Sequence, residues 1–423
     1  MGHEAAKGDG QRMVVEKEEL GRRLRAAREA CGMTQDEVAR DLGVSRSTIA
    51  QIELGNRPVT SLDLSRLADV FGRDMRELLG DSFRSQDTIV ALFRAEPDVR
   101  EQKQIVDALR KCVAVGRELS NLEQLLGIER IGVAPATYSL PTPTTKWDAI
   151  QQADHVAAEE RRRLGLGWLS LRDMNELLEA QGVRTGLIDL PDDVSGLTLT
   201  EATLGLFVVA NRKHAPLRQR FSFAHEYAHV LLDRARRGVV SRAADRDNLL
   251  EVRANAFAAA FLMPTEGVQR FVNGLGKGRA SRGYAEVFDE ADAVTVEGRT
   301  QPYTQEIQLY DVAQLAHHFG VSRVATIYRL GNLGLAKTPH VEALKAEEDA
   351  GKGATIARAM ELAEPDAEKA RNAFRQRFVG LALEAVRREE ITRAKATELA
   401  AMVGVSGKAL AALLTDTGLD EPT

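Results

Sequence analysis

A turn between two short amphipathic segments, within residues 34–52, constrains the fold of this chain more than any other sequence feature. Thr34 and Glu37 have the spacing of a capping box, which predicts that a helix begins there. Gly43 then predicts a tight turn, and Ser45 the start of a second helix. The inner faces of both helices would consist of Val38, Ala39, Leu42, Ile49 and Ile52. This pattern is typical of a helix-turn-helix.

The strings TQDEVARDLGVSRSTIAQIELGNRPV (34–59) and LSRLADVFGRDMRELL (64–79) closely resemble the Cro/C1-type (XRE family) DNA-binding domain. The resemblance implies an all-α helix-turn-helix domain that binds a double-stranded DNA operator. It implies that Gln35 holds a phosphate and that the second helix faces the base edges. The other residues that it places at DNA are Ser45, Arg46, Ser47, Gln51, Asn56 and Arg57.

The charge balance limits how strongly one copy of this domain can bind DNA. The chain has 57 Lys and Arg against 62 Asp and Glu, a formal net charge of −5, so it is not a protein that coats polyanions. We expect a local basic surface made by Arg22, Arg23, Arg25, Arg28 and Arg46. A homodimer on a two-fold operator would compensate for modest affinity. The alternative is a module that binds only other proteins.

Residues 99–126 have apolar side chains close to one face of a long helix. Two interpretations of that face are equally supported: a dimerisation helix, or a helix packed on its own domain. Three prolines, at Pro135, Pro141 and Pro143, then indicate a linker over residues 127–146.

The string His225-Glu226-Tyr227-Ala228-His229 is an H-E-x-x-H motif in a segment of helical period. Residues i and i+4 share a helix face, so both imidazoles can bind one Zn²⁺. Glu226 can then act as the general base on a water molecule. The alternative is two ordinary histidines in a helix. Tyr227 is expected to point away from the metal.

A catalytic zinc needs a third protein ligand and an open coordination position. Glu251 is a candidate for that ligand, since it follows His229 by 22 residues in another helical segment. Asn255 lies one turn beyond Glu251 on the same face, where it would support the site from the second coordination shell.

Two stretches, residues 195–233 and the pattern E-x-x-A-N-x-F-A-x-x-F-L-M-P at 251–264, resemble the ImmA/IrrE family of metallopeptidase-type regulators. The likeness extends over roughly residues 147–335, including a closing helix-turn-helix-like pair. It implies an α+β zincin-like domain with a gluzincin-like zinc site. The implied ligands are His225, His229 and Glu251, and the implied base is Glu226. It also implies a protein substrate, a DNA-bound repressor cleaved in a stress or prophage response.

The chain departs from that family at two places. Tyr227 and Ala228 replace the usual Leu and Gly of H-E-L-G-H, and a basic, glycine-rich insertion at 274–283 is expected to be a flexible loop. No residue is identified that would stabilise the oxyanion, and His214 is interpreted as a loop residue. His317 and His318 are interpreted as surface histidines. Residues 396–414 weakly echo a third helix-turn-helix, and a packing or dimerisation helix is favoured there.

The expected fold class is mostly α and multidomain. We assign residues 17–80 to the helix-turn-helix domain, 81–126 to a helical connector, 127–146 to a linker, 147–336 to the metallopeptidase domain and 337–423 to a helical C-terminal region. Strands are expected at 183–190 and 204–210. The N-terminus lacks an apolar signal region, no stretch is long enough to span a membrane, and the two cysteines form no C-x-x-C, so a cytoplasmic location is expected.

Two functions from different classes remain open. The first is a DNA-binding transcriptional regulator whose zinc endopeptidase domain cleaves a repressor in a stress, prophage or toxin–antitoxin response. The second is a non-proteolytic repressor or antitoxin-like protein that uses the peptidase fold as a sensor or interaction domain. A digestive protease is disfavoured, because such an enzyme has no use for a DNA-binding module.

Overall fold

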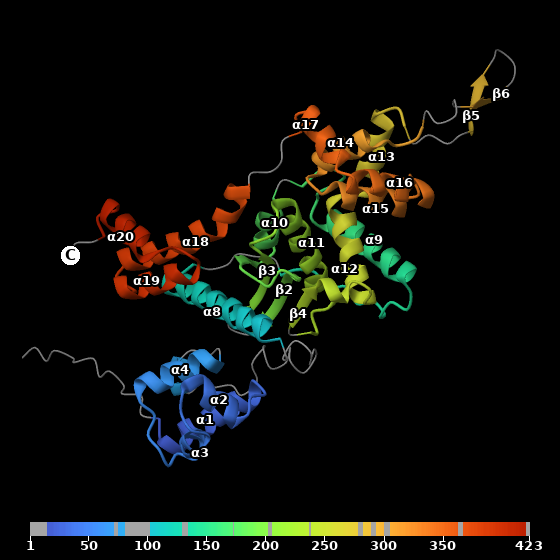
Figure 1. Ribbon diagram of the computed structural model, residues 1–423. Coiled ribbons are helices and arrows are strands. Elements are labelled where there is room, and N and C mark those ends of the chain that lie inside the picture. The colour runs from blue at the N-terminus through green and yellow to red at the C-terminus, as the bar shows by residue number, and fades with distance from the viewer. Residues whose placement is uncertain are drawn as a thin grey trace, which may run out of the picture.

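The computed structural model describes residues 15–71, 75–80, 102–128, 134–171, 173–201, 205–236, 238–277, 282–288, 293–299, 305–362 and 367–419. The chain is mostly helical, with one four-stranded mixed sheet and one two-stranded hairpin (Figure 1). This arrangement confirms the expected fold class. None of the helices in the described ranges offers an apolar stretch that would reach across a lipid bilayer.

The N-terminal domain is a small helical bundle around its own apolar core. Its helices are α1 (Lys17–Ala30), α2 (Gln35–Leu42), α3 (Arg46–Glu53), α4 (Ser61–Phe71) and α5 (Met75–Leu79). The capping box forms as expected: Thr34 Oγ1 accepts from the Glu37 N–H at 3.2 Å, and the Glu37 carboxylate accepts from the Thr34 N–H at 2.6 Å. Gly43 adopts φ 72° and ends α2. The helix-turn-helix geometry is therefore present.

The central sheet has the strand order β1-β3-β2-β4. Its strands are β1 (Arg184–Ile188), β2 (Val194–Glu201), β3 (Gly205–Asn211) and β4 (Gly238–Arg242). β1 runs parallel to β3, and the other two pairings are antiparallel. The sequence predicted β1 and β3 but not β2 or β4. Both missed strands contribute to the candidate site described below.

One face of the sheet is covered by a layer of helices, which includes the two that carry the H-E-x-x-H motif and its expected third ligand (Figure 1). They are α9 (Lys146–Arg163), α10 (Met174–Ala180), α11 (Pro216–Leu232) and α12 (Leu249–Leu262). Pro216 occupies the first turn of α11, where its missing N–H costs nothing. α12 is apolar on nearly all sides and is buried between α9 and α11.

Two buried arginines hold the C-terminal end of α12. Arg161 of α9 donates to Phe261 O at 2.6 Å, and Arg329 donates to Met263 O at 3.1 Å. These are the free carbonyls at the negative end of the helix dipole, where a cation is stabilised. Arg329 also pairs with Asp154 of α9 at 2.6 Å. The C-terminal end of α12, opposite to the end that carries Glu251, is therefore fixed to α9.

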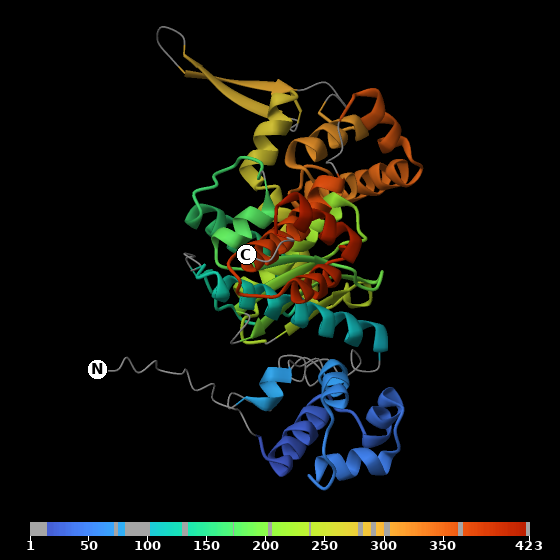
Figure 2. The ribbon, with the colours of Figure 1, turned by 90° about the vertical axis from the view of Figure 1, so that its left-hand side faces the viewer.

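A further helical unit follows α12. It contains α13 (Thr265–Gly274), α14 (Leu309–Phe319), α15 (Arg323–Asn332), α16 (Thr338–Asp349) and α17 (Lys352–Ala359). Residues 278–281 of the basic insertion, expected to be a flexible loop, lie outside the described residues. The described chain that follows forms a hairpin of β5 (Arg282–Phe288) and β6 (Ala293–Arg299). The hairpin projects away from the rest of the chain (Figures 1 and 2).

The other face of the sheet is covered by α8 (Lys103–Leu125) together with three C-terminal helices (Figure 2). The latter are α18 (Ala367–Arg387), α19 (Arg393–Met402) and α20 (Gly407–Asp416). Leu109, Val113 and Leu119 of α8 share one apolar cluster with Leu197 and Phe207 of the sheet. The apolar face of α8 is therefore buried within its own chain, against the sheet rather than against the N-terminal domain. The dimerisation interpretation of this face is wrong, because that face is already covered.

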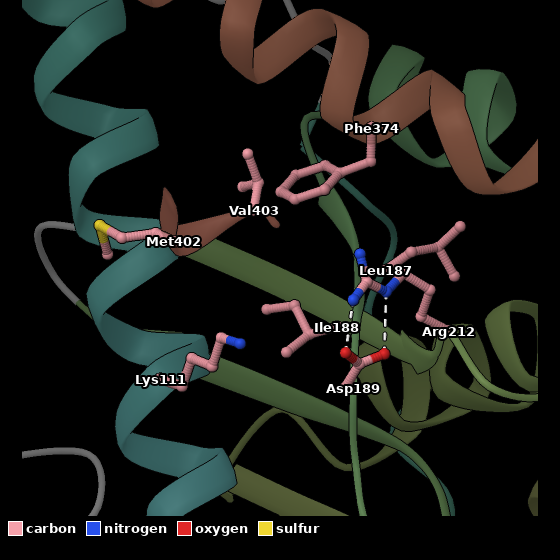
Figure 3. A pocket seen from close by; sticks show the side chains of 8 residues that line it. All are labelled: Lys111, Leu187, Ile188, Asp189, Arg212, Phe374, Met402 and Val403. Carbon is pink, nitrogen blue, oxygen red and sulfur yellow. Dashed lines mark hydrogen bonds and ion pairs between the residues drawn. The ribbon is translucent and has the colours of Figure 1, made fainter. Parts of the chain in front are cut away.

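Figure 3 shows where these helices meet the end of β1. Phe374 of α18 and Val403, just after α19, lie beside Ile188, while Lys111 approaches from α8. Asp189 and Arg212 form an ion pair next to them, with Arg212 Nε donating to Asp189 Oδ1 at 2.8 Å. The C-terminal region thus belongs to the same domain as the four-stranded sheet, which we call the sheet domain: β1–β4 with the helices that cover its two faces.

The described part of the expected linker, residues 134–146, lies against α9 and α11. Tyr138 donates its N–H to Leu231 O of α11 at 2.9 Å, and its hydroxyl to Glu160 of α9 at 2.9 Å. Arg234 donates to Pro135 O at 2.9 Å. Prolines here suit an extended strap that packs on α9 and α11, since an extended segment loses no helical hydrogen bonds.

We predict that Leu109→Ala lowers the free energy of unfolding of the sheet domain by about 2–5 kcal/mol, because it leaves a cavity under α8. Urea unfolding followed by far-UV circular dichroism would measure this change. Leu125→Ala, at a position 42% exposed on the same helix, is the control and should have little effect. A change in molar mass by light scattering, with unfolding unaltered, would restore the dimerisation interpretation.

Candidate metal centre and nucleic-acid interface

Three buried side chains converge between α11 and α12. His225 and His229 are one turn apart on α11, and Glu251 lies in the first turn of α12, after Asn248 has capped that helix. The Nε2 atoms of the two histidines are 3.3 Å apart. Glu251 oxygens lie 3.1 Å from His225 Nε2 and 3.4 Å from His229 Nε2. The structure therefore brings together the three residues expected to be metal ligands.

The second nitrogen of each imidazole is also occupied. His225 Nδ1 contacts Asn255 Oδ1 at 3.0 Å, so Asn255 lies where the sequence placed it. His229 Nδ1 contacts Asp233 Oδ2 at 2.9 Å. Sequence reasoning missed Asp233, although its i+4 spacing from His229 was a usable signal. Both histidines therefore direct Nε2 into the centre.

Glu226 lies beside the ligands and is fully buried. Thr198 of β2 donates its hydroxyl to Glu226 Oε2 at 2.7 Å. Ser241 of β4 lies opposite Gly196 in the sheet register, and its Oγ is 3.1 Å from His225 Nε2. A Cβ at Gly196 would come within 2.8 Å of Glu226 Oε1, so only glycine leaves room for the carboxylate there. These three strand residues were not anticipated, because their role depends on pairing between distant segments.

Burial and charge oppose each other at this centre. Burial raises the pKa of Glu226, although the two neighbouring histidines favour its ionised form. Burial lowers the pKa of His229, but hydrogen bonds to Asp233 and Glu251 outweigh it and raise the value to about 10. Burial acts to raise the pKa of Glu251, yet its contacts with both histidines hold it well below the usual range. The imidazoles and the Glu251 carboxylate thus stabilise each other's charged forms.

The donor set fits a tetrahedral divalent metal. Ligand atoms about 2.0–2.1 Å from a tetrahedral ion are about 3.4 Å from one another, close to the three separations above. Glu226 Oε1 is buried and makes no hydrogen bond within the described residues. An unsatisfied buried carboxylate oxygen is costly, so a polar partner at the centre would stabilise it. Two imidazoles and one carboxylate leave a fourth position free.

Tyr227 points away from the centre, as helical geometry predicted. Its hydroxyl donates to Glu160 of α9 at 2.5 Å, and its ring packs edge-on against Phe257 and Phe261 of α12. Burial raises its pKa, and Glu160 raises it further. Tyrosine at this position therefore ties α11 to both neighbouring helices, through a hydroxyl contact that the leucine of an H-E-L-G-H sequence could not make.

The other histidines lie outside the three-ligand cluster. His214 follows β3 and is mostly buried, with Nε2 3.4 Å from Asp192 O, so it belongs to a structured turn rather than a free loop. His317 is exposed at the end of α14. His318 is exposed as well, and its ring contacts Phe271 and Phe319. The metal-type cluster within the described residues is confined to His225, His229 and Glu251.

The expected DNA-contacting residues gather on α3 and the turn that follows. Those that are exposed are Ser45, Arg46, Ser47, Gln51, Asn56 and Arg57. Asn56 donates to Gln51 at 3.0 Å, which orients both amides. Ser45 is the N-cap of α3, where its Oγ accepts from the Thr48 N–H at 3.2 Å. Gln35 is half-buried and donates to Glu53 at 2.9 Å.

The arginines of α1 do not form the basic surface expected from the sequence. Arg23 is buried and donates to Leu78 O and Gly80 O. Arg28 pairs with Glu53 of α3, 2.5 Å from Arg28 Nε to Glu53 Oε1. Arg22 and Arg25 are exposed but form ion pairs with Glu19 and Glu29 of the same helix. The expectation was wrong because carboxylates at helical spacing and on α3 neutralise these cations.

Comparisons with known proteins match two parts of the chain. Residues 19–79 match a family described as a helix-turn-helix domain, and residues 178–289 match a peptidase family described as an IrrE N-terminal-like domain. The first region is similar to YazB of Bacillus subtilis (strain 168), named an uncharacterized HTH-type transcriptional regulator. The two are 41% identical over 64 residues, 15% of this chain and 93% of the relative. Both resemblances noted in the sequence are confirmed.

We predict that Tyr227→Phe lowers the free energy of unfolding by about 1–2 kcal/mol, because Glu160 loses a buried hydrogen-bond donor. Metal content should stay unchanged, since the hydroxyl points away from the ligands. Thermal unfolding and elemental analysis would measure the two effects. Tyr138→Phe removes the half-buried donor to the same carboxylate and should cost less. Loss of metal in Tyr227→Phe would contradict the separation of these roles.

Proposed function

The chain belongs to the helix-turn-helix-type transcriptional regulators, and from this premise we propose a DNA-binding regulator that also carries a zinc-dependent endopeptidase. The proposed protein substrate is a repressor, cleaved in a stress, prophage or toxin–antitoxin response. One observation carries the enzymatic part: His225, His229 and Glu251 converge at metal-binding distances with the Glu226 carboxylate beside them. The IrrE N-terminal-like match over this region supports it.

The N-terminal domain is proposed to bind a double-stranded operator through α3. Arg46, Ser47 and Gln51 would face base edges, and Asn56 and Arg57 the backbone. Because the arginines of α1 are neutralised, one copy offers few free cations. We therefore propose that two copies bind a two-fold operator, in the cytoplasm where the chromosomal DNA lies. Their contact surface is not the apolar face of α8, which the sheet covers.

In the proposed peptidase, two imidazoles and Glu251 hold Zn²⁺. The ion would polarise the scissile carbonyl and lower the pKa of water. Glu226 accepts the proton of the attacking water and delivers it to the leaving amine. Thr198 holds one carboxylate oxygen at 2.7 Å and leaves the other free for this exchange. Gly196 makes the space in which the carboxylate can sit.

β4 gives the proposed substrate a place to bind. Among the described strands it pairs only with β2, and its Ser241 lies against His225. An extended peptide adds readily to such a strand through main-chain hydrogen bonds. A substrate segment aligned with β4 would pass beside the metal ligands, which suits cleavage of an extended, exposed loop of a repressor.

A second candidate is favoured by the burial of the site. Glu226 is 0% exposed, and the three ligands are 2–7% exposed. A peptide can reach the carboxylate only after neighbouring groups move. A non-proteolytic regulator that uses this domain to bind metal or a partner would need no such opening. This is the alternative function, and the experiments below separate it from the first.

For DNA binding, we predict that Arg46→Ala in the full chain weakens operator binding by about 1–3 kcal/mol if the side chain makes a bidentate base contact. Mobility-shift titration with operator and scrambled DNA would measure the loss of specificity. Arg25→Ala is the matched control, since Arg25 lies on α1 and, like Arg46 with Asp36 at 3.6 Å, is an exposed arginine in an ion pair, here with Glu29. Equal effects of the two substitutions would contradict the assignment of α3 as the reading helix.

For the peptidase, we predict that Glu226→Gln keeps about one zinc per chain but abolishes cleavage, because it removes the base and not a ligand. His225→Ala, His229→Ala and Glu251→Ala should each lose zinc. Elemental analysis measures the metal, and mass spectrometry of new protein N-termini in host cells detects cleaved repressors. If wild type and Glu226→Gln give identical termini while regulation persists, the non-proteolytic alternative is correct.

A further inference from the structure

Asp233 contacts His229 through both its backbone and its side chain. It is the residue immediately after α11, and its N–H donates to His229 O at 2.9 Å. Its carboxylate oxygen Oδ2 lies 2.9 Å from His229 Nδ1. The backbone hydrogen bond fixes the position of the Asp233 Cα, and from there the side chain reaches back to the His229 imidazole.

The carboxylate imposes one tautomer on His229. An ionised carboxylate only accepts hydrogen bonds, so Nδ1 must carry a hydrogen, and Nε2 is the nitrogen left to bind a metal once its own proton is displaced. The corresponding partner of His225 is Asn255, at 3.0 Å. An amide presents an oxygen or an NH₂ group, so it is compatible with either tautomer. The two imidazoles therefore differ in their Nδ1 partner: His229 has a charged carboxylate there, whereas His225 has a neutral amide.

Arg253 holds the other oxygen of Asp233. Its Nη2 lies 2.8 Å from Asp233 Oδ1, and its Nη1 donates to Gln152 of α9 at 3.3 Å. Arg253 is buried on α12, two residues after Glu251. This pair neutralises the buried carboxylate, and it leaves Oδ2 for the imidazole.

We propose that Asp233 is a positioning residue for the metal, which sets the tautomer and ring orientation of His229. The inference rests on the proposed metal-dependent function and extends it beyond the three ligands. A carboxylate partner on a metal-bound histidine increases the basicity of the imidazole and restricts its rotation. Loss of such a partner typically lowers metal affinity about 10- to 100-fold.

A purely structural role makes a different prediction. If Asp233 served only to tie α11 to α12, breaking its ion pair from either side would have the same effect on the metal. If Asp233 acts on His229, loss of the carboxylate lowers the metal affinity, whereas loss of Arg253 preserves both the contact with Nδ1 and the metal affinity. Substitutions on the two sides of one ion pair therefore distinguish the roles.

The experiment measures Zn²⁺ affinity of the full-length chain by competition with a chromophoric chelator. Asp233→Asn should lower the affinity about 10- to 100-fold, and Arg253→Gln should remain within about threefold of wild type. The double variant Asp233→Asn/Arg253→Gln replaces the ion pair by two neutral amides, so it preserves folding if the single variant does not. It should show the same loss as Asp233→Asn.

The absorption spectrum of the Co²⁺-substituted chain provides a second measurement, and it should change in Asp233→Asn but not in Arg253→Gln. Asp245→Asn is the control, because Asp245 pairs with Arg242 at 2.7 Å and not with a ligand. Equal losses for Asp233→Asn and Arg253→Gln, or wild-type affinity in the double variant, would overturn the positioning role alone. A wild-type chain that binds no zinc would overturn the proposed metal site together with this role.

Discussion

The contact between α11 and α12 is the constraint on which the candidate metal centre depends, because its three candidate ligands come from both helices. Tyr227 packs against Phe257 and Phe261, with ring centroids 6.2 and 5.8 Å away, along the apolar side of this contact. The Asp233–Arg253 ion pair fixes the polar side. A displacement of one helix by an ångström would separate Glu251 from the histidines, so packing and polar contacts together set the ligand distances.

α9 reinforces this contact from outside. Its buried Glu160 accepts from Tyr227 of α11, and its Gln152 accepts from Arg253 of α12. Arg161 completes the set at the C-terminal end of α12. The buried charges are each paired or hydrogen-bonded, as a low-dielectric interior requires. The polar residues of α9 thus stabilise the contact between α11 and α12, a role that the weak amphipathic pattern of α9 does not predict.

Local sequence signals predicted which three side chains would converge as candidate metal ligands, and pairing between distant strands determined which residues surround them. The i, i+4 spacing of His225 and His229 is encoded within one helix, and so is the spacing of Asp233 from His229. Thr198 and Ser241 gained their roles only when β2 and β4 paired beneath α11, and hydroxyl residues in short strands carry no such signal by themselves. The amphipathic pattern of residues 99–126 showed that one face would be buried, but it contained no information about the covering surface.

The same limit applies to β2, whose alternate residues serve opposite sides of the sheet. Gly196 and Thr198 face the Glu226 carboxylate, whereas Leu197 and Leu199 join the apolar cluster of α8 and the C-terminal helices. The strand is therefore buried on both faces, and its polar positions are explained only by the carboxylate above them. The alternation of Gly196 and Thr198 with Leu197 and Leu199 is a strand pattern, but it does not show what the polar positions face.

Three Gly-Val-Ser turns illustrate how a local signal predicts geometry without function. They occur at 43–45, 320–322 and 404–406, with glycine φ values of 72°, 62° and 80°, and each serine caps the helix that follows. The glycine reverses the chain and the serine satisfies a free N–H, whatever the function of the helix that follows.

The exposed faces of the helices that follow these turns differ. In α15 the outward positions are Val324 and Tyr328, 39% and 48% exposed, while Arg323 forms an ion pair with Glu348. α3 instead exposes Arg46, Ser47 and Gln51. Base edges are read by hydrogen bonds, so the chemistry of the exposed face, and not the turn, is what supports the proposal that α3 reads the operator.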